Sequence, residues 1–324
     1  MSDPFVRPDT AAVLQGLKDQ GVPPFEALTP EQGRAFFREA IPGLDAEVGA
    51  LAVQRDLSCP GPAGNAIGLR LHDAKADRAP GPVAVFIHGG GWVLGELDQY
   101  TSFCAEMSRT LDMPVVSVDY RLAPEHPFPA APDDCEAAAR WIADGAAELG
   151  LSPTGLVIAG DSAGGNLAVA TSLALRDKPA AAPVIALWAI YPAVDSSMDD
   201  QSSKDFAEGY FLTAGAMEYF MGHYKPDTSS TRAVPIQADL AGLPPTLVHT
   251  AGLDPLRDQG RRFAAKCIEA GVQTTYKEAN GNIHGFILMR KAIPSSVVDT
   301  EIGLEALRDL IADARVSGAA KAAE

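Results

Sequence analysis

The sequence lacks any segment typical of a secretion leader or a membrane span. Its first residues, Met1-Ser2-Asp3-Pro4-Phe5, do not show the basic and then apolar pattern of a signal peptide. Apolar runs are short: the run at 183–190 has the length of a strand, well below the ~18–20 residues that cross a bilayer. We therefore expect a cytoplasmic protein that does not insert into membranes.

Cysteine is scarce, and its spacing suggests neither a metal site nor a disulfide framework. No Cys-x-x-Cys pair and no His-Glu-x-x-His motif occurs. In the absence of a secretion signal, isolated cysteines are more typical of reduced core residues than of disulfides. We expect no metal and no cofactor. The four cysteines are Cys59, Cys104, Cys135 and Cys267.

Positive charge is also in short supply. The chain has 26 Lys and Arg against 42 Asp and Glu, which gives a formal net charge of −16 at pH 7. This balance disfavours nucleic acids and anionic membranes as partners. No Gly-x-x-x-x-Gly-Lys-Ser/Thr loop is present, and no Gly-x-Gly-x-x-Gly turn opens a helix, so we expect no nucleotide site.

What the sequence does contain is an alternation of apolar strands and helical stretches. In the chain, this alternating region comes after a predicted β-hairpin with strands at 51–57 and 66–72. Alternation with crossovers of this length predicts a mostly parallel sheet that helices cover on both faces. The predicted strands are 83–87, 115–118, 156–159, 184–190, 246–250 and 274–277, and the helices 98–111, 133–149, 163–177, 256–270 and 299–314.

Two regions interrupt this rhythm. Residues 1–45 are predicted to form two helices, the second starting with a capping box at Thr29-Pro30-Glu31-Gln32. Residues 191–245 contain no apolar strand but many aromatic residues, and so long a connection is often a functional lid. We predict that these two regions form a helical cap on a core made of 46–190 and 246–315. A frayed tail, 316–324, would follow.

The most informative motif is Gly160-Asp161-Ser162-Ala163-Gly164. It lies between a predicted strand and a predicted helix, the context in which Gly-x-Ser-x-Gly marks a nucleophile on a sharp turn. Glycines are needed there because a Cβ would clash with the adjoining strand and helix. A serine in a glycine-rich turn can also be a simple turn or cap residue, but the flanking elements favour a nucleophile.

A second glycine-rich segment, reading His-Gly-Gly-Gly-Trp, follows the predicted strand at 83–87. Successive glycines leave backbone N–H groups uncovered, so they can face a developing negative charge. Such a loop forms one half of an oxyanion hole, and the N–H after the nucleophile, here that of Ala163, forms the other. The alternatives are a flexible glycine loop or a phosphate cradle, and the missing nucleotide motifs argue against the cradle.

A nucleophilic serine needs a base, and that base needs a carboxylate; in this fold their chain order is Ser, Asp or Glu, then His. Three histidines follow Ser162. His223 lies near a predicted helix end, and His249 lies within the predicted strand 246–250. His284 lies in a loop after a strand, where open α/β sheets keep their chemistry. We predict His284 as the base.

Asp254 is the predicted acid, because it follows the strand at 246–250. It could instead be only the N-cap of the next helix, with Pro255 at the first helical position. Asp258, one helical turn later, is the competing candidate.

Taken in order, these elements resemble the hormone-sensitive-lipase-like family of esterases, in its bacterial branch. They span roughly residues 50–315, most of the chain. The matching segments are His88-Gly89-Gly90-Gly91-Trp92, Tyr120-Arg121-Leu122-Ala123-Pro124-Glu125, Gly160-Asp161-Ser162-Ala163-Gly164-Gly165, Asp254-Pro255-Leu256-Arg257-Asp258 and His284-Gly285-Phe286.

The resemblance implies an α/β-hydrolase fold and a serine carboxylesterase for short to medium acyl esters, a small-molecule substrate. It implies that Ser162 is the nucleophile, Asp254 the acid and His284 the base. The oxyanion donors would be Ala163 and two of Gly89, Gly90 and Gly91, most often the latter two. The resemblance also implies homodimers joined through an edge strand and the last helix.

The substrate pocket is less well defined by the sequence. We predict that aromatic residues line it, namely Trp92, Tyr191, Phe206 and Phe211. An amidase or deacetylase with the same triad is an alternative, because the chemistry fixes the triad and leaves specificity to the pocket. A non-catalytic receptor on this scaffold is a remote alternative, since such receptors lose a triad member and this chain has all three.

Overall fold

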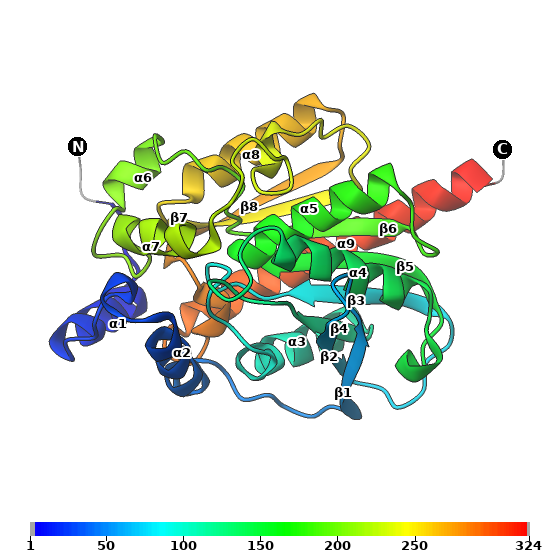
Figure 1. Ribbon diagram of the computed structural model, residues 1–324, viewed down its shortest axis with the longest axis horizontal. Coiled ribbons are helices and arrows are strands. Elements are labelled where there is room, and N and C mark those ends of the chain that lie inside the picture. Colours follow the sequence, from blue (N-terminus) through cyan, green and yellow to red (C-terminus); the bar gives the residue numbers. More distant parts are fainter. Residues whose placement is uncertain (1–3, 323–324) are drawn as a thin grey trace.

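A twisted eight-stranded sheet forms the centre of the computed structural model, which describes residues 4–322 and the side chains of residues 4–314 (Figure 1). The strand order is β1-β2-β4-β3-β5-β6-β7-β8. β1 pairs with β2, and β2 with β4, in antiparallel fashion, and all later pairs are parallel. The strands are β1 (Val53–Pro60), β2 (Ala66–Asp73), β3 (Gly81–Ile87), β4 (Val115–Asp119), β5 (Pro153–Asp161), β6 (Val184–Ile190), β7 (Thr246–Leu253) and β8 (Thr274–Ile283).

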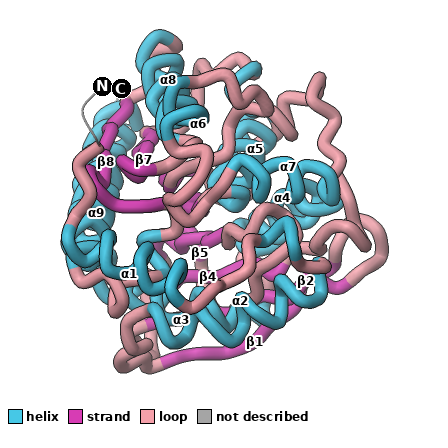
Figure 2. The backbone as a smooth tube through the Cα atoms, turned by 90° about the vertical axis from the view of Figure 1, so that its left-hand side faces the viewer, coloured by secondary structure: helices cyan, strands magenta, loops and turns pink. Residues whose placement is uncertain are grey.

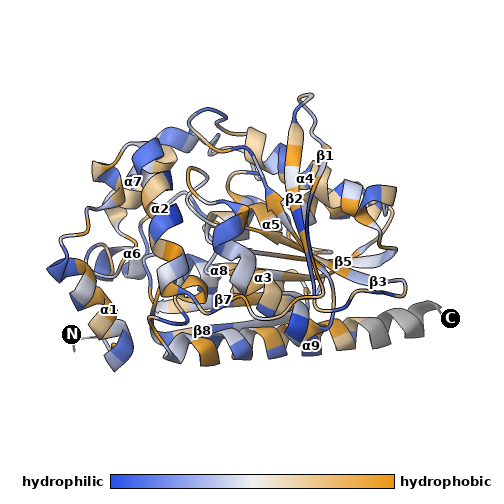
Figure 3. Cartoon of the chain, turned by 90° about the horizontal axis from the view of Figure 1, so that it is seen from below, coloured by the Kyte–Doolittle hydropathy of each residue, from blue (hydrophilic) through white to orange (hydrophobic). Residues whose placement is uncertain are grey.

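Helices cover both faces of the sheet. The helices α3 (Leu97–Leu111) and α9 (Ser295–Ala322) pack on one face and contact each other. The other face carries α4 (Ala130–Ala143), α5 (Ala163–Asp177) and α8 (Arg257–Glu269). The inner strands are therefore buried on both sides and read as continuous apolar runs rather than as alternating patterns. In Figure 3 these strands are mostly orange, the colour of hydrophobic residues.

A layer of short helices lies over the carboxyl ends of the strands. We call it the helical layer: residues 4–45 and 191–245, two segments that lie side by side although they are far apart in sequence (Figures 1 and 2). They meet where the ring of Phe25 packs against Phe211 and Phe220, at centroid distances of 6.3 and 5.7 Å. Its elements are α1 (Pro8–Asp19), η1 (Phe25–Ala27), α2 (Pro30–Leu44), α6 (Gln201–Asp205), α7 (Ala214–Tyr224) and η3 (Pro235–Gln237).

Ion pairs fasten the first segment of this layer to the core. Asp45, at the end of α2, forms a two-pronged pair with Arg290, and both side chains are buried. Arg7 pairs in the same way with Asp299 of α9. Breaking a buried pair from one side typically costs about 3–5 kcal/mol, because it leaves an uncompensated charge. The N-terminal helices are thus an integral part of the fold.

The predicted elements agree with the observed ones within a few residues, with three differences. The helix predicted at 133–149 is divided into α4 and η2 (Ala147–Leu149), because Gly145 adopts a left-handed conformation with φ +62°. β8 extends to Ile283, so His284 follows the strand directly. The tail predicted to fray from Val316 is helical as far as Ala322, and residues 323–324 lie outside the described part. The capping box of Thr29 and Gln32 is confirmed.

No helix within residues 4–322 combines the length and the apolar character that a bilayer crossing requires. The same residues contain no group of three or more His, Cys, Asp or Glu side chains arranged to hold a metal ion.

Candidate active site

Ser162 lies on a strained turn between β5 and α5. Its backbone has φ +56° and ψ −118°, a conformation that side-chain-bearing residues rarely adopt. Close approach of the chain explains the flanking glycines: a Cβ on Gly164 would lie 2.0 Å from the carbonyl oxygen of Ile87, and one on Gly160 would lie 2.2 Å from that of Gly164. The turn therefore lifts the serine to the carboxyl edge of the sheet, where it remains partly exposed.

Ser162, His284 and Asp254 form one chain of hydrogen bonds. His284 Nε2 lies 2.8 Å from Ser162 Oγ, and its Nδ1 lies 2.7 Å from Asp254 Oδ2. Asp254 is fully buried, whereas His284 keeps 6% of its surface exposed. Since a carboxylate only accepts, Nδ1 carries a proton and Nε2 is free to accept one from the serine.

Asp254 also stabilises the turn that leads into α8, although it is not the N-cap of that helix. Its other oxygen, Oδ1, accepts a hydrogen bond of 2.8 Å from the N–H of Leu256, at the start of α8. The competing Asp258 instead accepts from the N–H of Ser202 and pairs with Arg257. The N-cap of α8 is Leu256, which has no side-chain cap, so the interpretation of Asp254 as the N-cap is wrong. Asp254 uses one oxygen to hold the turn before α8 and the other to accept from His284.

The other two histidines lie away from this chain. His249 is buried in β7, where its ring stacks beside Trp188, and burial lowers its pKa to about 4. His223 lies in α7 against the ring of Tyr219. Neither is hydrogen-bonded to Ser162.

In the glycine loop after β3, one N–H group is used in a structural hydrogen bond and two others lie at the cavity. The N–H of Gly89 donates to Asp161 Oδ1 at 2.7 Å. The N–H groups of Gly90 and Gly91 donate to no group within residues 4–322, and both glycines line the cavity at Ser162. Ala163 is the first residue of α5, so its N–H also lacks an intrahelical acceptor. This arrangement leaves three donors at the serine.

Further hydrogen bonds hold the loop from behind. His88 Nδ1 lies 2.7 Å from the carbonyl oxygen of Gly89 and must donate to it. Burial lowers the pKa of His88 to about 4, which keeps the ring neutral near pH 7. The Tyr120 hydroxyl donates to the carbonyl of His88 at 2.9 Å. From the helical layer, Arg34 donates to the carbonyl of Val93, just beyond the loop, at 2.8 Å.

A cavity of ≈ 50 Å³ opens in front of Ser162 and is mostly apolar. Both segments of the helical layer contribute to it, together with the segment after His284. Its lining side chains from the layer are Phe25, Phe37, Ile41, Phe211, Leu212 and Phe220, and from the core Leu94, Tyr100, Leu288 and Met289.

Of the four predicted pocket residues, only Phe211 lines this cavity. Trp92 is buried elsewhere because its ring stacks on Tyr224 of α7 at 4.4 Å. Phe206 packs against Tyr210 in an apolar cluster that borders the cavity through Met289, but Phe206 itself does not line the cavity. These two predictions of pocket lining are therefore wrong.

Tyr191 is also absent from the lining, but it lies next to the site. Its ring packs on His284 at a centroid distance of 4.5 Å, and its hydroxyl donates to Asp161 Oδ2 at 3.3 Å. Sequence reasoning overlooked Asp161 itself, although its place within the nucleophile motif was a signal. Phe220 was noted only as one of many aromatics in the second segment.

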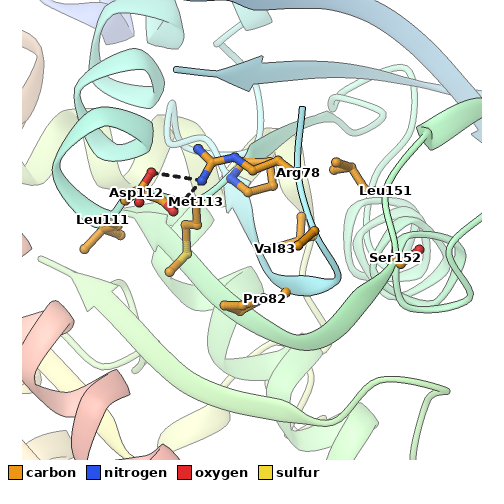
Figure 4. A pocket seen from close by; sticks show the side chains of 11 residues that line it. Arg78, Pro82, Val83, Leu111, Asp112, Met113, Leu151 and Ser152 are labelled. Atoms are coloured by element: carbon orange, nitrogen blue, oxygen red, sulfur yellow. Dashed lines mark hydrogen bonds and ion pairs between the residues drawn. The ribbon is translucent and has the colours of Figure 1, made fainter. Parts of the chain in front are cut away.

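A larger cavity of ≈ 290 Å³ lies at the opposite edge of the sheet, near the amino ends of β3 and β5 (Figure 4). Its one cation, Arg78, is already neutralised by Asp73 and Asp112, at 2.6 and 2.9 Å. The residues that line it include no histidine and no strained serine. Of these two cavities, only the smaller one is lined by the hydrogen-bonded serine and histidine.

Comparisons with known proteins identify the family of this chain. A family model described as an alpha/beta hydrolase fold matches residues 84–288. A carboxylic ester hydrolase of Mycobacterium tuberculosis is 38% identical over 83% of this chain and 73% of its own length. A carboxylesterase of the same species is 35% identical over 95% of this chain and 98% of its own.

A solved structure extends the likeness to the whole fold. The thermostable esterase from Pseudomonas putida superposes with a TM-score of 0.90 at 31% sequence identity, covering 96% of this chain and 99% of that one. The chain belongs to the hormone-sensitive-lipase-like family of esterases, which have the α/β-hydrolase fold.

Proposed function

We propose that this carboxylic ester hydrolase cleaves short to medium acyl esters through an acyl-enzyme on Ser162. The single observation that carries the proposal is the hydrogen-bonded chain from Ser162 through His284 to Asp254, with separations of 2.8 and 2.7 Å. A serine, a base within reach of its proton and a buried carboxylate behind that base are the parts that acyl transfer requires.

In the acylation step, His284 Nε2 takes the proton of Ser162 as Oγ attacks the ester carbonyl carbon. The tetrahedral intermediate collapses when His284 returns that proton to the leaving alcohol. Water then attacks the acyl-enzyme by the same route, and the carboxylic acid leaves. Throughout, Asp254 orients the imidazole and stabilises its charged form without taking the proton.

The negative charge of each intermediate would be held by backbone donors. We assign this role to the N–H groups of Ala163, Gly90 and Gly91, because that of Gly89 is already bonded to Asp161. One donor of this kind is typically worth about 10²–10³ in rate. These donors act without a cofactor.

The size of the cavity supports a short acyl group. Measured in the same way, one water needs roughly 10–15 Å³, so a cavity of ≈ 50 Å³ holds only a few water-sized groups. Its apolar walls offer no counter-charge to an ionised group on the acyl chain. We therefore infer that the acyl part of the substrate is neutral.

We propose that the helical layer is a cap that shapes this cavity and shields it from water. Phe37 and Ile41 of α2 reach the cavity from one segment, and Phe211 and Phe220 reach it from the other. Exclusion of water strengthens the electrostatic interactions within a site.

A homodimer and a cytoplasmic location are further proposals. β8 is an edge strand, and it carries the exposed Tyr276, while Val298 and Ile302 are exposed on the adjacent α9. A dimer would cover them, and Val298→Asp would then give a monomer in analytical ultracentrifugation. The free, buried cysteines suit a reducing compartment, which cell fractionation would test.

The deciding experiment is hydrolysis of p-nitrophenyl esters from acetate to palmitate by the wild type and by Ser162→Ala. We expect a fast rate with short chains that the substitution reduces by about 10⁶-fold. Equal activity in the two proteins would reject Ser162 as nucleophile. A wild type that is inert toward all esters but cleaves amides would favour the amidase alternative.

A further inference from the structure

We propose that Asp161, the residue before the nucleophile, is a positioning residue for both halves of the site. Its carboxylate orients the oxyanion loop Gly89–Gly91 and, through Tyr191, holds the imidazole of His284. The inference rests on the proposed function, because it concerns how the same reaction is assisted.

Asp161 binds three elements that meet only in the folded chain. Its Oδ1 accepts from the N–H of Gly89 at 2.7 Å, a contact between residues 72 positions apart. Its Oδ2 accepts from two hydroxyls, those of Tyr100 in α3 and Tyr191 after β6, each at 3.3 Å. The Tyr100 hydroxyl also accepts from the N–H of Gly89, at 3.1 Å. The carboxylate and the two tyrosines therefore form a closed network around the start of the loop.

The loop is shaped to receive this carboxylate. A Cβ on Gly89 would lie 2.6 Å from Asp161 Oδ2 and 2.9 Å from the carbonyl oxygen of Asp161, so no side chain fits at position 89. With the N–H of Gly89 turned toward Asp161, the N–H groups of Gly90 and Gly91 are left without partners beside Ser162. Asp161 thus determines which donors of the loop remain for the oxyanion.

The second half of the proposal concerns the base. The ring of Tyr191 lies against His284 at 4.5 Å and tilts by 53° to it, while its hydroxyl is tied to Asp161. On its other side, Tyr191 packs edge-on against Phe286. A ring fixed at both ends limits the motion of the imidazole between Ser162 and Asp254.

Burying a carboxylate at position 161 costs desolvation free energy, which argues that its charge has a role in the site. Asp161 is 3% exposed and has no cationic partner among its hydrogen bonds. Burial raises its pKa to about 7, against the lowering effects of the Gly89 N–H, of His284 and of the two tyrosines. An asparagine would avoid this penalty.

The raised pKa gives the proposal a signature in the pH profile. The hydroxyl and thiol groups around Asp161 stay neutral near pH 7, because burial raises the pKa of each: Tyr100, Cys104, Tyr120 and Tyr191. As pH falls below about 7, Asp161 gains a proton and its hold on Gly89 weakens. The acid limb of log kcat should then contain a contribution from the protonation of Asp161.

The test compares Asp161→Asn with Asp73→Asn, using p-nitrophenyl butyrate across the acid limb. Asp73 is a matched control: it is equally buried and hydrogen-bonded, but it lies at the opposite edge of the sheet beside Arg78. We expect Asp161→Asn to lower kcat by about 10–100-fold with little change in KM, because oxyanion donors act mainly in the transition state. The acid limb of its log kcat profile should become less steep, because an asparagine at position 161 does not titrate. Asp73→Asn should keep the wild-type kcat and limb.

Two results would overturn the proposal: a wild-type kcat in Asp161→Asn, or equal losses in the two variants. An unchanged slope of the acid limb would reject the role of the charge. If circular dichroism shows that Asp161→Asn is not folded, the variants Tyr191→Phe and Tyr100→Phe test the proposal instead, since each removes one hydroxyl that donates to Asp161. A severalfold fall in kcat at constant KM in both supports the proposal, and wild-type values in both reject it. A wild type inert toward every ester would refute the proposed function itself.

Discussion

The carboxyl edge of the sheet and the helical layer above it are held by different forces. At the edge, polar groups determine the structure: the carboxylates of Asp161 and Asp254 each accept several directed hydrogen bonds at buried positions. Within the layer, contact is mainly between aromatic rings, as between Phe25 and Phe220. Hydrogen bonds fix atoms within tenths of an ångström, whereas apolar packing tolerates exchange of one side chain for another of similar volume.

We infer from this difference that the edge controls the rate of the reaction and that the layer controls the choice among esters. On the function proposed above, residues of the edge form or support the groups that react, so we expect a change there to alter the rate with every ester. On the same proposal, residues of the layer shape the space for the acyl chain, so we expect a change there to alter the preference among esters. The exception is Arg34, whose guanidinium reaches from α2 to the carbonyl of Val93 and to Glu125, and so connects the layer to the oxyanion loop.

After Ser162→Ala, the largest effect is expected from Asp254→Asn, at the edge. The asparagine oxygen can still accept from the N–H of Leu256, but its NH₂ would face Nδ1 of His284 and favour the wrong tautomer. By analogy with other triads, we expect kcat to fall by about 10⁴-fold. Thermal denaturation should show a folded protein, and a loss below tenfold would contradict the role of Asp254.

A smaller effect is expected from removal of residues 1–44, which belong to the layer. The truncation keeps Asp45, so that Arg290 retains its buried partner. It removes Phe37 and Ile41 from the cavity, and Arg34 from behind the loop, so the substrate loses its position. A misplacement of this kind can cost about 10²-fold in kcat/KM. Unchanged kinetics over several acyl lengths, in a variant that is folded by circular dichroism, would remove the cap from our proposal.

Phe211→Ala should change selectivity rather than rate. The substitution enlarges the cavity, so the ratio of kcat/KM for the octanoate ester to that for the acetate ester should rise by about tenfold. A change of this size is within the discrimination that one or a few methylene groups give in an apolar pocket. Phe206→Ala is the matched control, because its ring lies in the same layer but outside the cavity. Equal shifts in the two variants would mean that loosening of the layer, and not the cavity wall, sets the preference.

The smallest kinetic effect is expected from Trp92→Phe, although Trp92 follows the oxyanion loop directly. Its indole stacks on Tyr224 away from the cavity, and its N–H has no hydrogen-bond partner to lose. We expect kcat/KM within about twofold of wild type and a free energy of unfolding lower by about 1–3 kcal/mol, measured with urea. A changed acyl preference would restore Trp92 to the pocket.

The sequence predicted the core well, because its signals are local. The nucleophile turn needs glycines at fixed offsets, and the ends of the strands are visible where apolar runs stop. Ser162, Asp254 and His284 could be selected in this way, since each lies after a predicted strand. That His284 follows β8 directly is seen only in the structure. The pocket could not be predicted so well. Trp92, Tyr191 and Phe206 are aromatic residues of the oxyanion segment or of the segment 191–245, but composition does not specify the direction of a side chain.

By itself, the sequence determined the order of strands and helices and the three residues that meet at the carboxyl edge, because parallel strands bring their ends to one side. Only the tertiary structure decided which loop donors remain free, since the N–H of Gly89 is taken by a carboxylate 72 positions away. It also decided which aromatics line the cavity, because α2 and the segment after α6 meet there from distant parts of the chain. Such contacts depend on how whole elements pack, and no local pattern encodes them.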